Sequence, residues 1–477
     1  MGKVRLEPEF RFKTSQGSVL SEGKEKFAYF KQIAIGSASG VVTLALIIAG
    51  FSISGASSSS VSKPSESASQ SASPTPSVTS SIARTCSVAT EAADPRLGTF
   101  SAVVINAATD EVLFDRNATT PASTASTMKM LTAAAALQVL GPNYRVETKV
   151  YQDPANPATI YLVGAGDPTL SRTANGKQSV YKDAPKLSDL AVAVNASLKG
   201  QAVSKIVLDS TLFSGPSWEP TWQRSEQTQG YMSEVTALQV DGDRKNPSAE
   251  TSARSTTPVA NAGRYFKAAL GASASAAAIS EAKMPAGMTQ IASVYSQPIS
   301  QWVKHMLLVS DNTQAEYLAR LVSLKQGFDG SFTSLNAAIK MGLNSTMISS
   351  ANVTIKDGSG LSDFNAVSPT YLAQLSKLIL GSQGNYSIIY QGLPIAHESG
   401  SLASRFGGDN LDAAGHIIAK TGWIKRGYTL AGIINAKDST QLTFAIYALG
   451  NVKDDAKDAI DNLATAIYRC GNQLSNN

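Results

Sequence analysis

The sequence predicts a mixed α/β (α+β) fold: an antiparallel sheet built from both ends of one domain, flanked by helices, with a strand-rich insert. Apolar, β-branched runs lie near both ends of the region between Cys86 and Cys470, and helical spacing dominates between these runs. Short strand-like pieces with Gly, Pro and Asp turns occupy residues 150–295. We therefore expect a main domain of residues 86–149 and 296–477 that carries residues 150–295 as an inserted domain.

Residues 32–53 form a long apolar stretch in the 477-residue chain. The stretch contains no charged residue and is long enough to cross a bilayer as a helix. Basic residues outnumber acidic ones in residues 1–31, so the positive-inside rule predicts a cytoplasmic tail, a transmembrane anchor and an exported remainder. A cleaved signal peptide ending near residues 54–56 is the alternative, although its n-region and apolar segment would be long for one. The predicted location is thus the cell membrane, with the N-terminus in the cytoplasm, or outside the cell if cleavage occurs.

Residues 54–85 consist mainly of Ser, Pro, Thr and Ala, and we expect them to form a disordered linker. Such a segment cannot bury enough apolar surface to offset the chain entropy lost on folding. The two cysteines lie on the exported side and bracket everything that is expected to fold. We therefore expect a disulfide between Cys86 and Cys470, with two buried free thiols as the alternative.

The overall charge gives no sign of a nucleic-acid partner. The formal net charge is +5, and the basic residues are spread along the chain instead of forming a dense block. A metal or other cofactor is not implied either, because "HESGS" from His397 lacks the second histidine of a zinc-protease motif.

The first chemical motif lies where a hairpin gives way to a helix. Residues 99–118 contain two strand-like runs joined by "NAATD", and residues 121–141 then switch to helical spacing. Ser126 and Lys129 form an S-x-x-K pair there, on one face of the first helical turn. A neutral Lys129 could take the hydroxyl proton of Ser126, provided that burial or positive charge lowers its pKa. Four other S-x-x-K pairs occur in the chain, so the spacing alone does not single out this one.

Two further motifs follow in the C-terminal half. Ser310 and Asn312 form an S-D-N sequence at the exit of an amphipathic helix, where a hydroxyl can relay a proton and an amide can hold a substrate carbonyl. Lys420, Thr421 and Gly422 form a K-T-G sequence on a predicted strand. The lysine could face a substrate carboxylate, the threonine could donate a second hydrogen bond, and the glycine would let a substrate backbone approach. The neighbouring Trp423 could supply an oxyanion N–H.

The three motifs in this order are typical of β-lactamases and penicillin-binding proteins. The chain resembles the low-molecular-mass class C penicillin-binding proteins, the D-alanyl-D-alanine carboxypeptidase/endopeptidase family. Further resembling stretches are "LVGAGDPTLSR" from Leu162, "VLDSTLFSG" from Val207, "VTALQVDGD" from Val235 and "KDGSGLSDFNAVSP" from Lys356. The long gap between the first two motifs is also characteristic of this family, because its members carry an inserted domain there.

The resemblance implies a penicillin-binding fold with a helical subdomain beside the sheet. It also implies a serine-type D-Ala-D-Ala carboxypeptidase, with endopeptidase activity left open, that acts on peptidoglycan stem peptides and is inhibited by β-lactams. It implies that Ser126 is acylated, with Lys129 as its base and Ser310 as the relay to the leaving amine. Asn312 would contact a substrate amide. Lys420 and Thr421 would form the carboxylate clamp. The N–H groups of Ser126 and Trp423 would form the oxyanion hole. The bulk of Trp423 directly after K-T-G departs from the family pattern.

Three alternatives compete with this interpretation. A histidine-based serine hydrolase is disfavoured because only His305, His397 and His416 are available and no G-x-S-x-G elbow occurs. A serine β-lactamase would need a positioned base for rapid deacylation, which the sequence does not reveal. A non-catalytic penicillin-binding sensor or scaffold is disfavoured because all the expected catalytic side chains are present.

Overall fold

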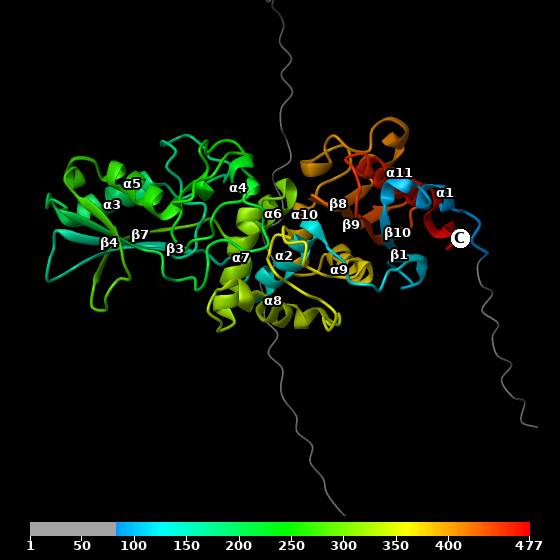
Figure 1. Ribbon diagram of the computed structural model, residues 1–477, viewed down its shortest axis with the longest axis horizontal. Coiled ribbons are helices and arrows are strands. Elements are labelled where there is room, and N and C mark those ends of the chain that lie inside the picture. Colours follow the sequence, from blue (N-terminus) through cyan, green and yellow to red (C-terminus); the bar gives the residue numbers. More distant parts are fainter. Residues whose placement is uncertain (1–82) are drawn as a thin grey trace, which may run out of the picture. The chain divides into compact units, whose positions relative to one another are not determined.

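The computed structural model describes residues 83–477, whose arrangement is shown in Figure 1. Two five-stranded sheets form its framework. The predicted tail 1–31, the predicted anchor 32–53 and nearly all of the predicted linker 54–85 lie outside the described residues. Within residues 83–477, no helix is both long enough and apolar enough to span a bilayer.

The first sheet is antiparallel and is built from both ends of the described chain, as the sequence predicts. Its strand order is β2-β1-β10-β9-β8, which leaves β8 at one edge. β1 and β10 pair along their whole length, from Thr99 opposite Leu449 to Asn106 opposite Leu442. The strands are β1 (Thr99–Asn106), β2 (Val112–Arg116), β8 (Ile417–Ile424), β9 (Gly427–Asn435) and β10 (Gln441–Leu449).

Two apolar cores lie on opposite faces of this sheet, because successive side chains of a strand point to opposite sides. In β1, Val103 and Ile105 join the core on one face, and Ala102 and Val104 join the core on the other. The second of these cores is closed by the terminal helices α1 (Ala89–Ala92) and α11 (Ala456–Cys470). The first is covered by α2 (Met128–Val139), α6 (Ile299–Val309), α7 (Asn312–Lys325), α8 (Leu335–Leu343), α9 (Pro369–Leu380) and α10 (Tyr386–Gly392).

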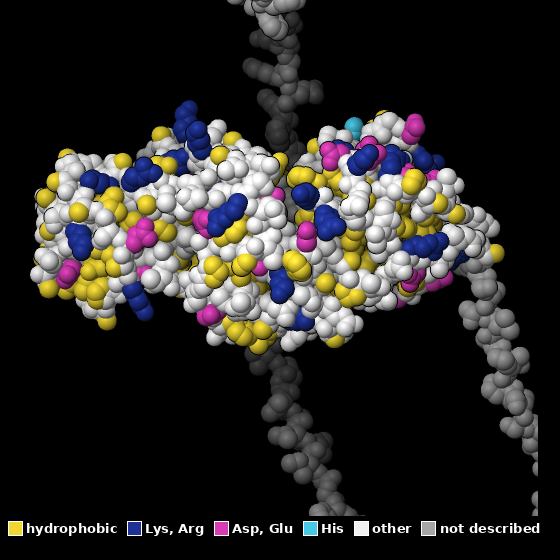
Figure 2. All heavy atoms as spheres, in the orientation of Figure 1, with side chains coloured by type: hydrophobic (Ala, Val, Ile, Leu, Met, Phe, Trp, Pro, Cys, Tyr) yellow, Lys and Arg dark blue, Asp and Glu magenta, His cyan; other side chains and the backbone are white. Residues whose placement is uncertain are grey.

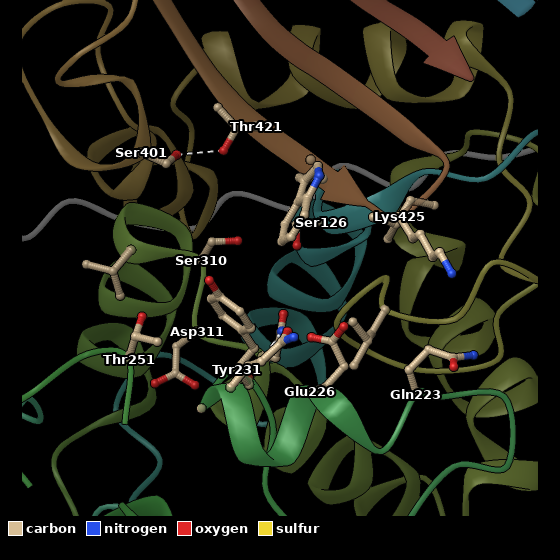
Figure 3. Close-up of a pocket in the computed structure, with 18 of the residues that line it drawn as sticks. Ser126, Gln223, Glu226, Tyr231, Thr251, Ser310, Asp311, Ser401, Thr421 and Lys425 are labelled. Carbon is tan, nitrogen blue, oxygen red and sulfur yellow. Dashed lines mark hydrogen bonds between the residues drawn. The ribbon is translucent and has the colours of Figure 1, made fainter. Parts of the chain in front are cut away.

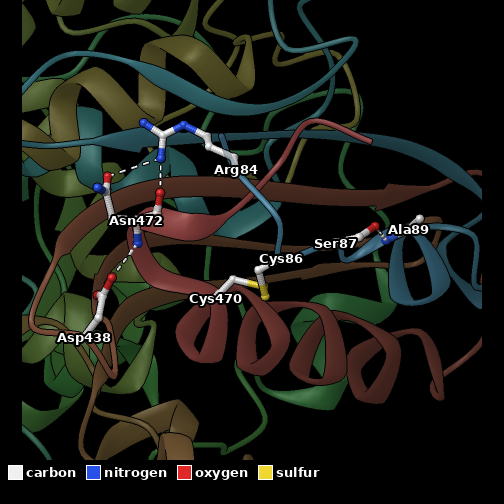
Figure 4. The surroundings of a disulfide bond; sticks show 7 residues. All are labelled: Arg84, Cys86, Ser87, Ala89, Asp438, Cys470 and Asn472. Carbon is white, nitrogen blue, oxygen red and sulfur yellow. Dashed lines mark hydrogen bonds between the residues drawn. A yellow bond between two sulfur atoms is a disulfide. The ribbon is translucent and has the colours of Figure 1, made fainter. Parts of the chain in front are cut away.

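Cys86 and Cys470 form a disulfide, as predicted, with their Cα atoms 5.4 Å apart (Figure 4). Cys470 is the last residue of α11, and Cys86 lies just before α1. Backbone hydrogen bonds run beside the disulfide: the Cys86 N–H donates to Gln473 at 2.9 Å, and the Cys86 carbonyl accepts from the Ser475 N–H at 2.8 Å. The two ends of the described chain are therefore joined by covalent and hydrogen bonds together.

The second sheet lies between residues 147 and 295 and has the order β6-β5-β4-β3-β7. Its strands are β3 (Glu147–Gln152), β4 (Thr159–Val163), β5 (Lys205–Asp209), β6 (Ala278–Glu281) and β7 (Thr289–Tyr295). β4, β5 and β6 pair in parallel, whereas β3 is antiparallel to both of its neighbours. α3 (Leu187–Leu198) and α5 (Pro258–Leu270) pack on this sheet through a core of their own. The exact limits of the insert stay a prediction.

Charged side chains of both signs are mixed over the surface. Figure 2 shows Lys and Arg side chains scattered among Asp and Glu on the visible face. An exposed ion pair such as Arg469 with Asp412, at 2.8 Å, adds little to stability because water screens it. By contrast, the ion pair between Arg244 and Asp311, the middle residue of the S-D-N motif, is buried.

Candidate active site

Ser126 and Lys129 lie side by side at the start of α2. Ser126 belongs to a short 3-10 turn, Ala125–Thr127, that leads directly into the helix. Lys129 Nζ lies 2.8 Å from Ser126 Oγ, 2.7 Å from Asn312 Oδ1 and 2.7 Å from the Ser359 carbonyl oxygen. The two carbonyl oxygens can only accept hydrogen bonds. When the amine is neutral they therefore take its two N–H groups, and its lone pair faces the Ser126 hydroxyl.

Burial lowers the pKa of Lys129, so that part of the amine is neutral near physiological pH. Its side chain is fully buried, and removal from water disfavours the ammonium form, so its pKa falls to about 8. The carboxyl groups of Asp357, Glu316 and Asp311 oppose this shift. The sequence argument requires a lysine with a lowered pKa, and burial is what lowers it here.

A loop in the "KDGSG" stretch, residues 356–360, contacts Lys129. The sequence analysis assigns no role to this loop. Both oxygens of Glu316, on α7, accept backbone N–H groups of this loop, at 3.0 Å from Gly358 and 2.7 Å from Ser359. Those bonds orient the loop whose Ser359 carbonyl accepts from Lys129. Gly360 follows with φ +84°, and a Cβ there would lie 1.8 Å from the Ala125 carbonyl oxygen. The glycine is therefore required for the loop to reach the Ser126 turn.

The S-D-N motif forms the corner between α6 and α7. Ser310 ends α6 in a left-handed conformation with φ 64°. Asp311 caps the N-terminus of α7 by accepting the Gln314 N–H at 3.0 Å. Asn312 opens α7, and its Nδ2 donates to the Tyr231 carbonyl at 3.2 Å. Asn312 thus contacts both Lys129 and a segment near the second sheet.

The K-T-G motif lies on β8, the edge strand of the first sheet. Thr421 shares a hydrogen bond of 2.6 Å with Ser401, a residue that sequence reasoning missed (Figure 3). A Cβ on Gly422 would lie 2.0 Å from Thr429 Oγ1 and 3.0 Å from the Ser126 nitrogen, so only glycine lets β8 pass this close to Ser126. The close approach brings the Ser126 and K-T-G segments together.

Lys420 is placed differently from its neighbours. Its side chain is fully buried, does not line the cleft, and donates to the Thr421 carbonyl at 3.0 Å. Burial, with a further contribution from Lys129, holds its pKa well below the usual value. The role of Lys420 in a carboxylate clamp therefore stays a prediction, whereas Thr421 does face the cleft.

A cleft of about 700 Å³ connects these motifs. Ser126, Ser310, Asn312, Thr421, Gly422 and Trp423 all line it. Its opposite wall comes from segments 221–231 and 250–254, and in Figure 3 Glu226 and Tyr231 lie across from Ser126. Tyr231 meets half-exposed Trp423 edge to face, with ring centroids 6.2 Å apart. Sequence reasoning missed this wall because nothing local in it resembles a catalytic motif.

The histidines lie away from this chemistry. None of them lines the cleft, and His305 is held by Gln314 at 2.6 Å and Glu250 at 3.1 Å. Among residues 83–477 no group of His, Cys, Asp or Glu side chains could hold a metal ion. Ser126, which lines the cleft, has Lys129 and no histidine beside it.

The family model of the D-Ala-D-Ala carboxypeptidase 3 (S13) family matches residues 85–254 and 244–469. The chain belongs to this family. It is 35% identical over 395 residues to a carboxypeptidase of Mycobacterium tuberculosis, covering 81% of this chain and 84% of that one. It is 34% identical over 385 residues to carboxypeptidase DacB of Mycolicibacterium smegmatis, covering 80% and 82%.

The fold also matches a solved member of the penicillin-binding proteins. The crystal structure of penicillin binding protein 4 from Haemophilus influenzae superposes with a TM-score of 0.66 at 20% identity and covers 77% of this chain and 95% of that one. A second structure of that protein holds a β-lactam and superposes with a TM-score of 0.61. The predicted class C penicillin-binding family, its fold and the D-Ala-D-Ala carboxypeptidase function are confirmed at the level of the family. The roles of the individual site residues stay predictions.

Proposed function

We propose that this S13-family carboxypeptidase works through an acyl-enzyme on Ser126, with Lys129 as the base. The observation that carries the proposal is the set of three contacts at Lys129 Nζ. The oxygens of Asn312 and Ser359 take the two N–H groups of the neutral amine, so its lone pair faces Ser126 Oγ. The substrate is the D-Ala-D-Ala end of a peptidoglycan stem peptide, lying along the exposed edge of β8. β-Lactams occupy the same cleft as inhibitors.

The reaction begins when Ser126 Oγ attacks the carbonyl carbon of the D-Ala-D-Ala bond and its proton passes to Lys129. The N–H groups of Ser126 and Trp423 stabilise the oxyanion. As the C–N bond breaks, Ser310 relays the proton from Lys129 to the leaving amine, and D-Ala departs. Water then attacks the ester: its hydroxyl group stays on the released peptide, and its proton returns to Ser126 Oγ. A β-lactam stalls at the ester because its opened ring stays attached and blocks the approach of water.

Substrate binding uses the remaining motif residues. Asn312 contacts a substrate amide, and the hydroxyl of Thr421, oriented by Ser401, donates to the terminal carboxylate. Lys420 is buried below this position and acts on the carboxylate through its positive field when it is charged. Gly422 leaves room for the substrate backbone at the edge of the sheet.

We also propose that residues 32–53 anchor the enzyme in the bacterial membrane, with residues 1–31 in the cytoplasm and the linker 54–85 spanning toward the wall. The apolar length and the basic flank support this location. Membrane fractionation, followed by mass analysis of the N-terminus, tests it. An intact N-terminus in the membrane fraction supports the anchor, and a new N-terminus near residue 56 in the soluble fraction contradicts it.

The catalytic proposal is tested by labelling the purified full-length protein with a fluorescent penicillin and mapping the adduct by peptide mass. We expect the adduct on Ser126 and release of D-Ala from a D-Ala-D-Ala pentapeptide. The Ser126→Ala variant should lose both, whereas Ser280→Ala, which alters another S-x-x-K pair on β6, should keep both. An adduct elsewhere would refute the proposal, and rapid turnover of penicillin would favour a β-lactamase.

A further inference from the structure

A left-handed turn in segment 241–244 packs against the S-D-N corner. Asp241, Gly242 and Asp243 have φ values of 52°, 58° and 55°, so three consecutive residues adopt the left-handed conformation, which glycine adopts freely and aspartate adopts at some cost. Such strain persists only where surrounding contacts enforce it, and it is concentrated at functional positions. We therefore expect the turn to position a neighbouring side chain.

The turn is held in place by its own hydrogen bonds. The N–H groups of Asp241 and Gly242 donate to the carbonyls of Leu170 and Pro168, each at 2.7 Å. The carboxylate of Asp243 accepts the Ser255 N–H at 2.7 Å. These bonds offset the strain and fix the direction in which the chain leaves the turn.

The residue that leaves the turn is Arg244, and its guanidinium reaches the middle residue of S-D-N. Arg244 Nη2 lies 2.8 Å from Asp311 Oδ2, and Nη1 donates to the Tyr181 hydroxyl at 2.7 Å. The Tyr181 hydroxyl lies 3.2 Å from the same Asp311 oxygen, which closes a triangle. A Cβ on Gly242 would lie 2.7 Å from Arg244 Nη1 and 2.8 Å from the Tyr181 hydroxyl, so the glycine leaves the space that this triangle fills.

The triangle is shielded from water. The Arg244 and Asp311 side chains are each 2% exposed. Burial would raise the pKa of Asp311, but Arg244, His305 and Arg254 together hold it well below its usual value, so the carboxylate stays charged. Its second oxygen caps α7 through the Gln314 N–H. Both oxygens are therefore committed, one to the left-handed turn and one to the helix.

Asp311 lies between the two functional residues of the motif. Ser310 precedes it in a left-handed conformation, and Asn312 follows it and accepts from Lys129 at 2.7 Å. A shift of the Asp311 carboxylate would move both neighbours, because a single backbone corner joins them. A misplacement of reacting groups by about 1 Å can lower a rate by about 100-fold.

We propose that Arg244 is a positioning residue of the active site. Through its contact with Asp311, it ties the left-handed turn 241–244 to the S-D-N corner and holds that corner in place. This inference rests on the proposed function, since it concerns the same acylation of Ser126. Arg244 contacts Asp311 directly and acts on Ser310 and Asn312 through it. The segment between the first and second motifs thus contributes to catalysis as well as forming the far wall of the cleft.

The test compares acylation of the full-length protein and its Arg244→Gln variant by a fluorescent penicillin. We expect the first-order acylation step to slow by about 100-fold while the dissociation constant of the reversible complex changes little. Arg244→Lys, which keeps the charge but loses the fork that spans Asp311 and Tyr181, should recover part of the rate. A rate equal to that of the wild type in folded Arg244→Gln would overturn the proposal.

Arg320→Gln is the matched control, because Arg320 is also buried but its guanidinium donates to backbone carbonyls, at 3.0 Å to Gly330 and 2.9 Å to Pro216, and does not contact Asp311. It should lower the unfolding temperature without slowing acylation, and equal slowing in both variants would assign Arg244 a merely structural role. If Arg244→Gln does not fold, Tyr181→Phe removes the two bonds of the triangle that its hydroxyl makes, to Arg244 and to Asp311, and should slow acylation several-fold. An unchanged rate would count against the proposal. Failure of the wild type to be acylated on Ser126 would refute the proposed function itself.

Discussion

Lys129 Nζ lies 2.8 Å from Ser126 Oγ, inside a site where two acceptor-only carbonyl oxygens occupy its other contacts. Burial lowers the pKa of the amine, and in the neutral amine this arrangement sets the lone pair toward the hydroxyl. It also makes the chemistry of the site sensitive to the protonation of one side chain.

Replacing Lys129 by methionine should abolish acylation while leaving the fold intact. Methionine fills a similar buried volume but cannot take a proton, and loss of a general base lowers rates by about 100-fold to 10,000-fold. The rate of fluorescent-penicillin attachment measures the loss, and near-UV circular dichroism checks the fold. Lys283→Met, which alters the lysine paired by spacing with Ser280, should leave the rate unchanged. A rate within a factor of three of the wild type in Lys129→Met would rule out the base role.

The pH dependence of acylation should follow Lys129. Its pKa is lowered to about 8 by burial, so the amine is protonated and inactive below that pH and neutral above it. We expect the second-order acylation rate to rise about tenfold per pH unit up to pH 8 and then to level off. The measurement is a rate profile with a penicillin between pH 5 and pH 10. A flat profile across pH 6 to 9 is incompatible with this prediction.

Gly422→Ala should damage both stability and acylation. The added Cβ would lie 2.0 Å from Thr429 Oγ1 and 3.0 Å from the Ser126 nitrogen, so β8 must move away from the nucleophile. Overpacking of this kind costs about 1–3 kcal/mol of unfolding free energy. Thermal unfolding and penicillin labelling measure the two effects. The control is Gly407→Ala, where the nearest atom would lie 3.8 Å away and little change is expected. Equal behaviour of the two variants would contradict the prediction.

Ser401→Ala should weaken substrate binding more than it slows turnover. Its hydroxyl shares a 2.6 Å hydrogen bond with Thr421, which we expect to contact the substrate carboxylate. Loss of one such bond is worth about 1 kcal/mol, so KM for a D-Ala-D-Ala peptide should rise about fivefold. Steady-state kinetics separate KM from kcat. A fall in kcat at constant KM would instead place Ser401 in the chemical step.

Removing the disulfide should lower stability without altering the site. The bond joins residues 384 positions apart, and the chain-entropy model assigns such a long loop about 6 kcal/mol of stabilisation. Neither Cys86 nor Cys470 lines the cleft. A Cys86→Ser, Cys470→Ser double variant should therefore unfold at lower denaturant concentration, yet acylate normally while folded. Slower acylation at low temperature would show coupling between the disulfide and the cleft.

Local patterns in the sequence predicted much of the framework. Apolar, β-branched runs near both ends of the region between Cys86 and Cys470 predicted strands, and the structure pairs them in one antiparallel sheet. The strand pieces of the second sheet were also predicted, because alternation and turn residues are local signals. The parallel pairing of β4 with β5 was not, since pairing direction depends on how the intervening chain returns.

The sequence by itself determined the family motifs, the order in which they occur and the chemistry that each side chain can supply. Only the tertiary structure decided which remote groups support them: Glu316 beneath the Ser359 loop, Ser401 beside Thr421, and Arg244 against Asp311. These partners are separated by 43, 20 and 67 residues, respectively. The periodicity of a segment shows which face of a helix or strand is apolar. A hydrogen bond between distant segments depends instead on how whole helices and strands pack together. The same packing removes Lys129 from water and thereby lowers its pKa.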